Sequence, residues 1–243
     1  MKISQLARLA THAPLAVLPS AIKRPIYNRV FGFRIAPTAK IGLSILDVDH
    51  LEMEDGAKIG HGNLLHRTEH VHLGRGAEIG YGNLVRGGAA VELDEYSTVV
   101  RFNVLNSIPD NDCQGSPDPR LVLGKGAYVV SGHRLDFTDR ITLGKNVIVA
   151  GRNSSFWTHN RQETRPIEIG DFSYVGSEVR IAPGARLGDE SILGMGAVLA
   201  GQLDGGKVSG GVPAKPIREV TSAEKQTLHR PSRKDVPPGT LDD

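Results

Sequence analysis

Aliphatic residues recur along most of this chain at an interval that neither an α-helix nor an alternating strand produces. Successive anchors stand mostly 20 residues apart: Met53, Leu73, Leu93, Leu123, Leu143 and Ile169. A second aliphatic residue precedes each anchor by two positions, a third follows it by six, and a fourth usually follows it by twelve. From Ile169 the interval shortens to six, through Val175, Ile181, Leu187, Leu193 and Leu199. An amphipathic helix would need apolar residues at i, i+3, i+4 and i+7, which this stretch lacks.

The six-residue interval predicts a solenoid. Six residues are enough for one short strand and one corner, so three units close one coil of about 18 residues. Apolar residues at every sixth position then point inward and stack on their equivalents one coil away, roughly 4.8 Å along the axis. We predict an all-β fold, a parallel β-helix of about eight coils, over residues 35–210. Residues 1–34 are expected to form a basic helical lid, and residues 211–243 a closing segment with a short helix and a disordered tail.

Composition narrows the function classes. Glycine supplies 29 of the 243 residues, which suits a chain that turns many tight corners. The net charge of +2 gives no signal for nucleic-acid binding. A single cysteine, Cys113, excludes an intramolecular disulfide and suits a reducing compartment, and no apolar run is long enough to span a bilayer. We expect a cytoplasmic protein.

The basic charge is concentrated at the N-terminus. Residues 1–46 contain seven Lys and Arg side chains and no Asp or Glu. Together with several Leu, Val and Ile residues, they allow peripheral contact with an anionic membrane at the inner face. The simpler interpretation is a helical lid with solvated bases, because Pro14, Pro19 and Pro25 interrupt a long amphipathic face.

A polar column accompanies the repeat ten positions after each anchor: Asn63, Asn83, Asn103, His133 and Asn153. Asparagines stacked at equivalent positions form side-chain hydrogen-bond ladders, so a structural role is expected for them. His133 interrupts the ladder. The aliphatic pattern itself has one exception, Ser155, where an inward residue is expected.

Two insertions interrupt the register and are the natural carriers of function. Ten residues are added within 106–120, and six around 156–160, where the sequence reads Phe-Trp-Thr-His-Asn. Both follow the same inward position, so both should project from the same edge. Loops held out from a rigid scaffold are the usual place for binding and catalytic residues.

The Ile-Gly-containing repeat, followed by Gly-Gly-Val-Pro-Ala-Lys-Pro-Ile-Arg at residues 210–218, resembles the hexapeptide-repeat acyltransferases. The similarity is strongest to the maltose and galactoside O-acetyltransferases and the polysaccharide O-acetyltransferases. It implies a left-handed β-helix, a homotrimer with active sites between subunits, acetyl-CoA as acyl donor, a sugar or glycan hydroxyl as acceptor, and no metal.

The resemblance also implies a catalytic site. Thr158-His159 matches the family's general base, and an imidazole with a pKa near 6.5 can accept the proton of a hydroxyl that attacks the thioester. His133 lies where these enzymes place an acceptor or oxyanion contact, and Trp157 offers a flat apolar wall to the acceptor. Asp136 and Asp139 are candidate contacts to sugar hydroxyls, although solvated turn residues are the simpler interpretation.

The same resemblance assigns coenzyme A contacts. The pantetheine arm would follow coil edges at Ser177, Met195 and Gly196, and the nucleotide phosphates would meet two basic residues, Lys215 and Arg218. The chain departs from the family in one place, because Ala200-Gly201 stands where relatives often carry a Thr-Lys pair.

Two other functions remain open from the residues alone. His61 and His66 have the His-x-x-x-x-His spacing of γ-class carbonic anhydrases, in which three imidazoles hold zinc. The expected position of the third histidine, near residue 25, is Pro25. A non-catalytic trimeric scaffold is the other alternative.

Overall fold

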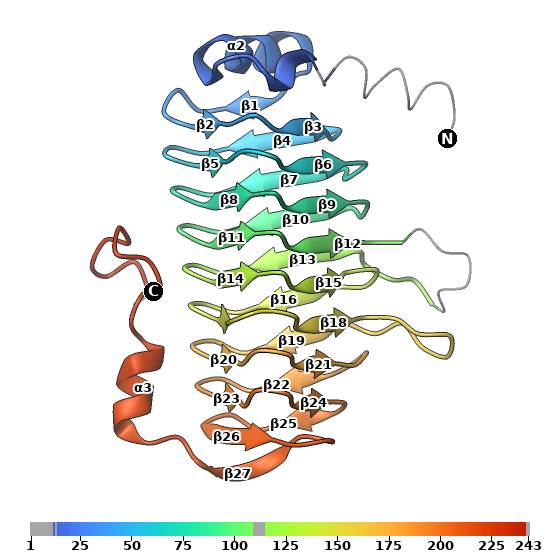
Figure 1. Ribbon diagram of the computed structural model, residues 1–243, viewed down its shortest axis with the longest axis vertical. Helices are drawn as coiled ribbons and strands as arrows, with labels where there is room; N and C mark the ends of the chain where they lie inside the picture. The colour runs from blue at the N-terminus through green and yellow to red at the C-terminus, as the bar shows by residue number, and fades with distance from the viewer. Residues whose placement is uncertain (1–11, 13, 109–114, 242–243) are drawn as a thin grey trace.

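Three parallel sheets wind around one axis in the computed structural model, which describes residues 12, 14–108 and 115–241 (Figure 1). Sheet A contains β1 (Arg34–Ile35), β4 (His50–Met53), β7 (His70–Leu73), β10 (Ala90–Leu93), β13 (Arg120–Leu123), β16 (Ile141–Leu143), β19 (Ile167–Ile169), β22 (Arg186–Leu187) and β25 (Gln202–Leu203). Sheet B contains β2 (Lys40–Ile41), β5 (Lys58–Ile59), β8 (Glu78–Tyr81), β11 (Thr98–Arg101), β14 (Tyr128–Ser131), β17 (Ile148–Val149), β20 (Tyr174–Val175), β23 (Ile192–Leu193), β26 (Lys207–Gly210) and β27 (Lys215–Glu219). Sheet C contains β3 (Ile45–Asp47), β6 (Leu64–His66), β9 (Leu84–Arg86), β12 (Val104–Asn106), β15 (Arg134–Asp136), β18 (Ser155–Trp157), β21 (Arg180–Ile181) and β24 (Val198–Leu199). From β1 to β26 every third strand of the chain thus joins the same sheet, and the predicted hexapeptide-repeat β-helix is confirmed.

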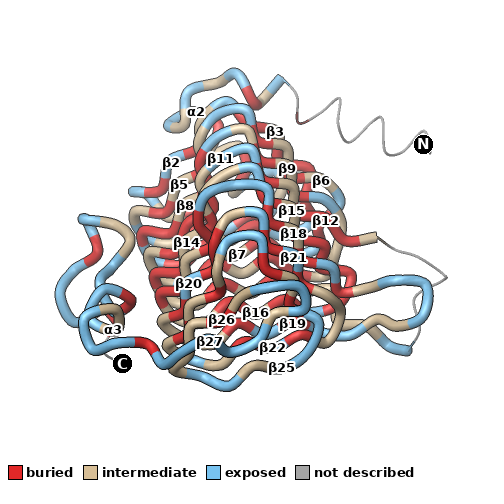
Figure 2. Tube along the Cα trace, turned by 60° about the horizontal axis from the view of Figure 1, so that its bottom comes forward, coloured by how far each residue is buried: buried red, intermediate tan, exposed pale blue. Residues whose placement is uncertain are grey.

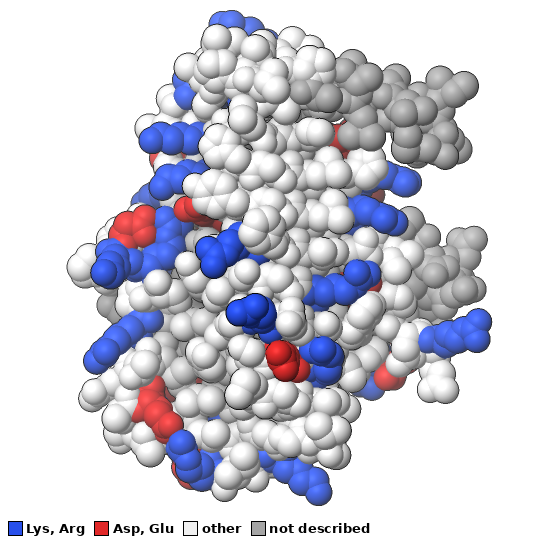
Figure 3. Space-filling model, in the orientation of Figure 1, with Lys and Arg blue, Asp and Glu red and all other residues white. Residues whose placement is uncertain are grey.

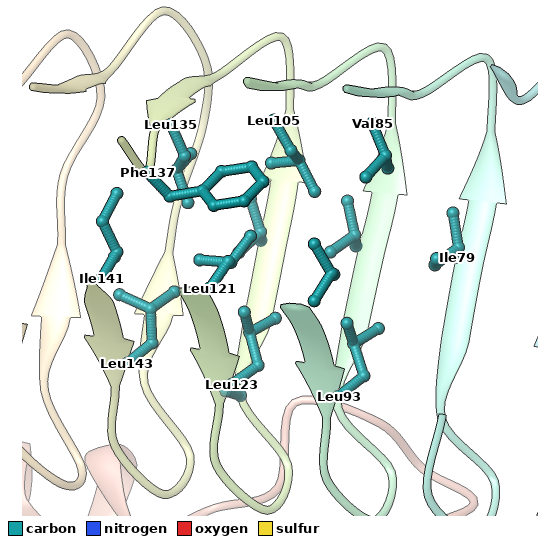
Figure 4. Close-up of a cluster of buried hydrophobic side chains, with 14 of the residues drawn as sticks. Ile79, Val85, Leu93, Leu105, Leu121, Leu123, Leu135, Phe137, Ile141 and Leu143 are labelled. Carbon is teal, nitrogen blue, oxygen red and sulfur yellow. The ribbon is translucent and has the colours of Figure 1, made fainter. Parts of the chain in front are cut away.

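The predicted anchors form continuous buried stacks. Leu93 pairs in register with Leu123, and Leu123 with Leu143, and none of the three is exposed. Figure 4 shows these side chains pointing into the space between the sheets, with the ring of Phe137 filling the corner between sheets C and A. Because each stack repeats one coil apart, every coil buries its aliphatic residues against the coils before and after it.

The corners need small residues. The fourth position after an anchor holds the buried residues Ala57, Ala77 and Ala127, where a larger side chain would separate two strands. At the corner between sheets B and C, a Cβ on Gly80 would overlap the carbonyl oxygen of Val100 in the next coil. Glycine is therefore required there by close backbone approach rather than by a left-handed φ.

The exception expected at Ser155 is corrected by the register. Leu135 pairs with Phe156, whose side chain is completely buried, while Ser155 pairs with Arg134 on the outer face. One residue is added at the preceding corner, between Val149 and Asn153, where Gly151 has a φ of 64°. The aliphatic stack is therefore continued by an aromatic ring, and the following insertion is one residue shorter than the spacing predicted.

The polar column is a hydrogen-bond ladder along the corner between sheets B and C. The side-chain oxygen of Asn63 accepts the backbone N–H of Asn83 at 2.9 Å, and that of Asn83 accepts the N–H of Asn103 at 3.0 Å. Asn103 then accepts the N–H of His133 at 2.9 Å. The next member is Ser154, whose N–H lies 3.2 Å from His133 Nδ1. The prediction that Asn153 continues the ladder is therefore wrong, because one residue is added at this corner.

His133 is a neutral member of this ladder. Its side chain is buried, and burial lowers its pKa from 6.5 to about 4, although a hydrogen bond with the Gly151 backbone acts in the opposite direction. An imidazolium would place an added proton, and its charge, inside the coil. The native state therefore excludes the proton that an unfolded chain accepts near pH 6.5.

Replacement of His133 by Asn should remove part of the acid sensitivity of the fold. Above about pH 6.5 a neutral His133 costs the folded state nothing. As the pH falls from about 6.5 to about 4, the free energy of unfolding should decrease by about 3 kcal/mol, because only the unfolded chain takes up the proton. Urea unfolding of the wild type and of His133→Asn between about pH 7 and about pH 4 measures it. The variant, which extends the asparagine ladder, should lose less stability, and equal losses in both proteins would contradict this account.

The two ends of the solenoid are closed differently. Helix α2 (Ser20–Val30) lies across the first coil, and its buried Lys23 donates to the carbonyl oxygens of Ala16 and Gly42. At the other end, β27 pairs antiparallel with β26, and α3 (Ser222–Leu228) begins with the capping box formed by Thr221 and Glu224.

The sequence predicts a disordered C-terminal tail. In the structure, the described part of this tail packs against the solenoid. Arg233 donates to the carbonyl of Gly76 at 2.7 Å and to Thr98 Oγ1 at 3.1 Å. Leu241 is buried close to Gly126. In Figure 2 this segment runs beside the sheet B side of the coils, away from the two insertions.

Candidate active site

The candidate site lies where sheet C turns into sheet A. Both insertions leave the solenoid at this corner, after β12 and after β18, and project from the same edge as predicted (Figure 1). The second insertion is stabilised at its base by a bridge between His159 and Thr164 and by the Asn160 N–H, which donates to the Glu163 carbonyl at 2.9 Å. It is therefore a folded loop with a defined position for His159.

His159 is paired with a buried carboxylate. Its Nδ1 lies 3.0 Å from Asp136 Oδ1, and the Asp136 side chain is completely buried while that of His159 is 18% exposed. A carboxylate at this distance fixes the tautomer in which Nδ1 carries the proton and donates it to Asp136. The other ring nitrogen, Nε2, is then an acceptor, which is the form a general base requires.

Threonine hydroxyls position this pair. Thr138 Oγ1 donates to Asp136 Oδ1 at 2.7 Å, the same oxygen that His159 meets. Thr158 Oγ1 donates to the backbone carbonyl of Asp136 at 2.8 Å and accepts the N–H of Asp139 at 2.9 Å. The insertion is thus tied to β15 directly beside His159, which restrains the imidazole relative to the carboxylate.

Asp136 is the residue that sequence reasoning missed. The sequence predicts a solvated turn residue or a sugar contact at this position, whereas the structure shows a buried carboxylate paired with His159. The register contains the signal, because Asp136 pairs with Trp157, two residues before His159. Asp139 is also buried, and its carboxylate accepts the N–H groups of Asp118 and Arg140 rather than facing a ligand.

A cavity of about 420 Å³ opens beside His159. The residues around it come from three strands of sheet C and from the corner that follows them: Trp157, His159, Asn160, Arg180, Ile181, Ala182, Pro183 and Val198. Its walls are mostly apolar, and Trp157 is 37% exposed. The guanidinium of Arg134 lies over the indole ring, 5.0 Å from the ring centroid. The predicted base and the predicted acceptor wall therefore share one cavity.

The predicted coenzyme A contacts lie elsewhere on the chain. Ser177 and Gly196 are neighbours at the corner between sheets B and C, where the Gly196 N–H donates to the Ser177 carbonyl at 2.9 Å, and Met195 is exposed beside them. His159 is at the opposite edge of sheet C. A single chain does not bring these residues together.

Lys215 and Arg218 are both on β27 and both exposed. Arg218 donates to the two carboxylate oxygens of Glu224 at 2.8 Å each, and this ion pair raises its pKa. Lys215 forms no ion pair with any residue that the structure describes. Of the two, Lys215 has the charge that is free for another anion.

His133 is not in the cavity. It is buried inside the corner between sheets B and C, within the ladder described above. Its position gives it a structural contact with Asn103 and Ser154 and no open path to the cavity that His159 lines.

His61 and His66 lie at opposite ends of the segment that contains β6. His61 Nδ1 accepts the Leu43 N–H at 3.0 Å, and its ring stacks on Tyr81. His66 Nδ1 lies 2.6 Å from Asp47 Oδ2 at the other edge of sheet C. Within residues 12, 14–108 and 115–241, no three His, Cys, Asp or Glu side chains are grouped to hold a metal. No described helix has the length and hydropathy needed to cross a membrane.

Comparisons with known proteins find similarity to several acetyltransferases. No family model matches it. It is 33% identical over 100 residues to the galactoside O-acetyltransferase of Escherichia coli, covering 37% of this chain and 48% of that protein. It is 26% identical over 173 residues to a protein named as an acetyltransferase in Saccharomyces cerevisiae, covering 60% of this chain and 87% of that protein. A third relative, named as a colanic acid biosynthesis acetyltransferase in Escherichia coli, is 29% identical over 112 residues, covering 43% of this chain and 62% of that protein.

The chain thus spans about half the length of the first of these relatives. Among solved structures, a UDP-N-acetylglucosamine acyltransferase superimposes with a TM-score of 0.60 over 80% of this chain and 74% of that chain, at 16% identity, which shows the fold alone. The similarity predicted from the repeat and the closing segment is confirmed: the chain is a hexapeptide-repeat β-helix protein that resembles the O-acetyltransferases.

Proposed function

We propose that this protein transfers an acetyl group from acetyl-CoA to a hydroxyl of a sugar or polysaccharide. The observation that carries the proposal is the His159–Asp136 pair, with 3.0 Å between Nδ1 and Oδ1, at the wall of an apolar cavity. A sugar hydroxyl is a poor nucleophile at neutral pH, so a base with a fixed tautomer is the group this reaction needs. The similarity to acetyltransferases supports the choice of an acetyl group and of a sugar or polysaccharide acceptor.

The chemistry follows from the orientation of the imidazole. Nε2 of His159 accepts the hydroxyl proton as the acceptor oxygen attacks the thioester carbonyl, and Asp136 stabilises the imidazolium that forms. Collapse of the tetrahedral adduct breaks the carbon–sulfur bond, and the proton passes from Nε2 to the departing sulfur. The products are the acetyl ester and free coenzyme A. The base returns to its starting form.

Removal of the imidazole should abolish most of the turnover. His159→Ala should lower kcat by about 10²–10⁴-fold, the range contributed by general-base catalysis, with a smaller change in the KM for acetyl-CoA. Asp136→Asn should also lower kcat, because the amide does not hold the base in the required tautomer. Release of free thiol in the presence of acceptor measures both variants.

His72→Ala, on the outer face of sheet A, is the matched control and should leave turnover unchanged. Unchanged turnover in His159→Ala would remove it as the base. A full loss in His159→Ala with none in Asp136→Asn would show that the carboxylate does not set the tautomer.

The positions of the residues assigned to coenzyme A, the acyl donor, imply that the complete site spans two chains. Ser177, Met195, Gly196, Lys215 and Arg218 are the residues assigned to coenzyme A, and the first three are separated from His159 by the width of sheet C. A neighbouring copy that places its corner between sheets B and C against this chain's cavity would bring donor and base together. We therefore propose a homotrimer whose active sites lie between subunits.

The outer face of sheet C has the surface for such contacts. The first residue of each of its strands in the first four coils points outward, is aliphatic and is only partly buried: Ile45, Leu64, Leu84 and Val104. The adjoining corner adds Leu43, Tyr81 and Phe102, which are 51%, 53% and 64% exposed. In Figure 3 the middle of the upper coils shows a strip without Lys, Arg, Asp or Glu. An apolar patch of this kind marks an association surface.

A charge on this face should separate the subunits. The wild type should sediment as three copies of the 26.1-kDa chain, and Leu84→Glu as one copy with its β-sheet signal intact. Activity should fall with the trimer, because the donor groups come from the neighbour. Thr142→Glu, on the outer face of sheet A, is the control and should remain trimeric. A wild-type chain that sediments as a monomer would contradict the shared site.

The N-terminal cap supports the proposed membrane contact. The outward side of α2 exposes Ile22, Arg29 and Val30, and Val17 before it is 70% exposed. Apolar side chains beside bases, in a segment without acidic residues, fit the surface of an anionic bilayer. The cytoplasmic location is proposed with it, because acetyl-CoA and an inner leaflet both belong to that compartment.

Vesicle flotation tests this contact with the full chain. The protein should float with vesicles containing phosphatidylserine and less with pure phosphatidylcholine, since each surface base adds about 1 kcal/mol of attraction. The double variant Ile22→Asp/Arg29→Glu should remain at the bottom of the gradient. Arg230→Glu, an exposed base at the other end of the molecule, should float like the wild type. Equal flotation with both vesicle types would refute the contact.

A further inference from the structure

The outward column of sheet C changes character at the coil that holds the base. After Ile45, Leu64, Leu84 and Val104, the next positions in the same register are Arg134, Ser155 and Arg180. Two strand spacings separate the two arginines, roughly 10 Å between Cα atoms. The small Ser155 between them leaves the space above β18 open to both side chains.

These two arginines have no acidic partner among the residues that the structure describes. Other arginines of the same region do, since Arg140 pairs with Asp118, Arg165 with Glu163, and Arg186 with Glu168. Arg134 lies over the Trp157 ring, and its Nε is buried without a hydrogen-bond partner in the described chain. Arg180 donates to the Asn153 carbonyl at 2.6 Å, which orients its guanidinium without neutralising it.

The arginines are placed on the acceptor side of the reaction. Arg180 and Trp157 line the same cavity as His159, so an anion bound between the arginines lies next to the base. The phosphates of acetyl-CoA are separated from its thioester by the whole pantetheine arm, and they cannot occupy this position while the thioester is beside His159. The acceptor is the remaining source of negative charge.

We propose that the acceptor is an anionic sugar, with its carboxylate or phosphate ester bound between Arg134 and Arg180 and its ring against Trp157. The proposal rests on the proposed acetyl transfer and adds the class of the acceptor. Arginine suits this task because its planar fork donates two parallel hydrogen bonds to a carboxylate or phosphate. The uncharged Ser155 hydroxyl and the indole face complete a subsite for an acidic sugar ring.

Trp157 is the only tryptophan of the chain, so its fluorescence reports on this subsite directly. The trimeric full chain is titrated with methyl glucuronide, glucose 6-phosphate and the neutral methyl glucoside. At least one anionic sugar should bind roughly tenfold or more tightly than the neutral one, with the advantage reduced by added salt. Arg134→Gln and Arg180→Gln should each reduce this preference, and the double variant should abolish it.

Arg186→Gln is the matched control, because Arg186 is on the outer face of sheet A and is paired with Glu168. It should keep the wild-type preference. Equal binding of all three sugars to the wild type, or a preference that survives the double substitution, would overturn the proposal. Dissociation of the trimer by the two substitutions would overturn it too, because the arginines would then be contacts between subunits.

Steady-state kinetics distinguish a role of the arginines in acceptor binding from a role in acetyl-CoA binding. In the variants the KM for the anionic acceptor should rise by a larger factor than the KM for acetyl-CoA or the KM for a neutral acceptor. A rise in the KM for acetyl-CoA alone would assign the arginines to the donor phosphates and refute the proposal. Selective sugar binding without any acetyl transfer would leave the anionic subsite standing and refute the proposed function.

Discussion

The in-register stacking of aliphatic side chains between coils is the interaction on which the rest of this structure depends. Each inward residue contacts its equivalents one coil above and below, so the register of any coil is set by both neighbours. A slip by one residue would turn buried side chains outward along the whole strand. Extra residues are therefore accommodated at the corners. The chain places them there, after β12, before β18 and after β18.

Because the register is fixed, the outward side chains of successive coils form columns. The chemical character of these columns is independent of the residues in the core. The inward face of sheet C stays apolar from β3 to β24 because the core requires it. Its outward face is free to change, and it does so from aliphatic to basic between Val104 and Arg134. One strand thus serves the core with Leu135, the outer face with Arg134, and the base with Asp136.

Much of the fold can be predicted from the sequence, because each six-residue unit corresponds to one strand and one corner of a coil. The anchors, the small corner residues and the asparagine ladder are all local patterns. The error at Ser155 has a local cause that leaves no mark in the period: one residue is added to the corner between Val149 and Asn153, where Gly151 has a φ of 64°. His159 could be predicted from a motif, whereas Asp136 could not. The pairing of Asp136 with His159 depends on an insertion that folds back, which is a tertiary contact.

The chain contains a second pair of the same kind, and the comparison shows what makes a candidate base. His66 lies 2.6 Å from the buried Asp47 and is 18% exposed, as His159 is. However, His66 belongs to β6 itself and pairs in register with Asp47 of β3, so this contact is part of sheet C. His159 stands on an insertion outside the ladder, beside Trp157 and an apolar cavity. A carboxylate fixes the tautomer in both pairs, but only an imidazole that adjoins space for a thioester and a hydroxyl can use it. The same kind of hydrogen bond therefore stabilises a coil at one end of the solenoid and orients the candidate base, His159, nearer the other.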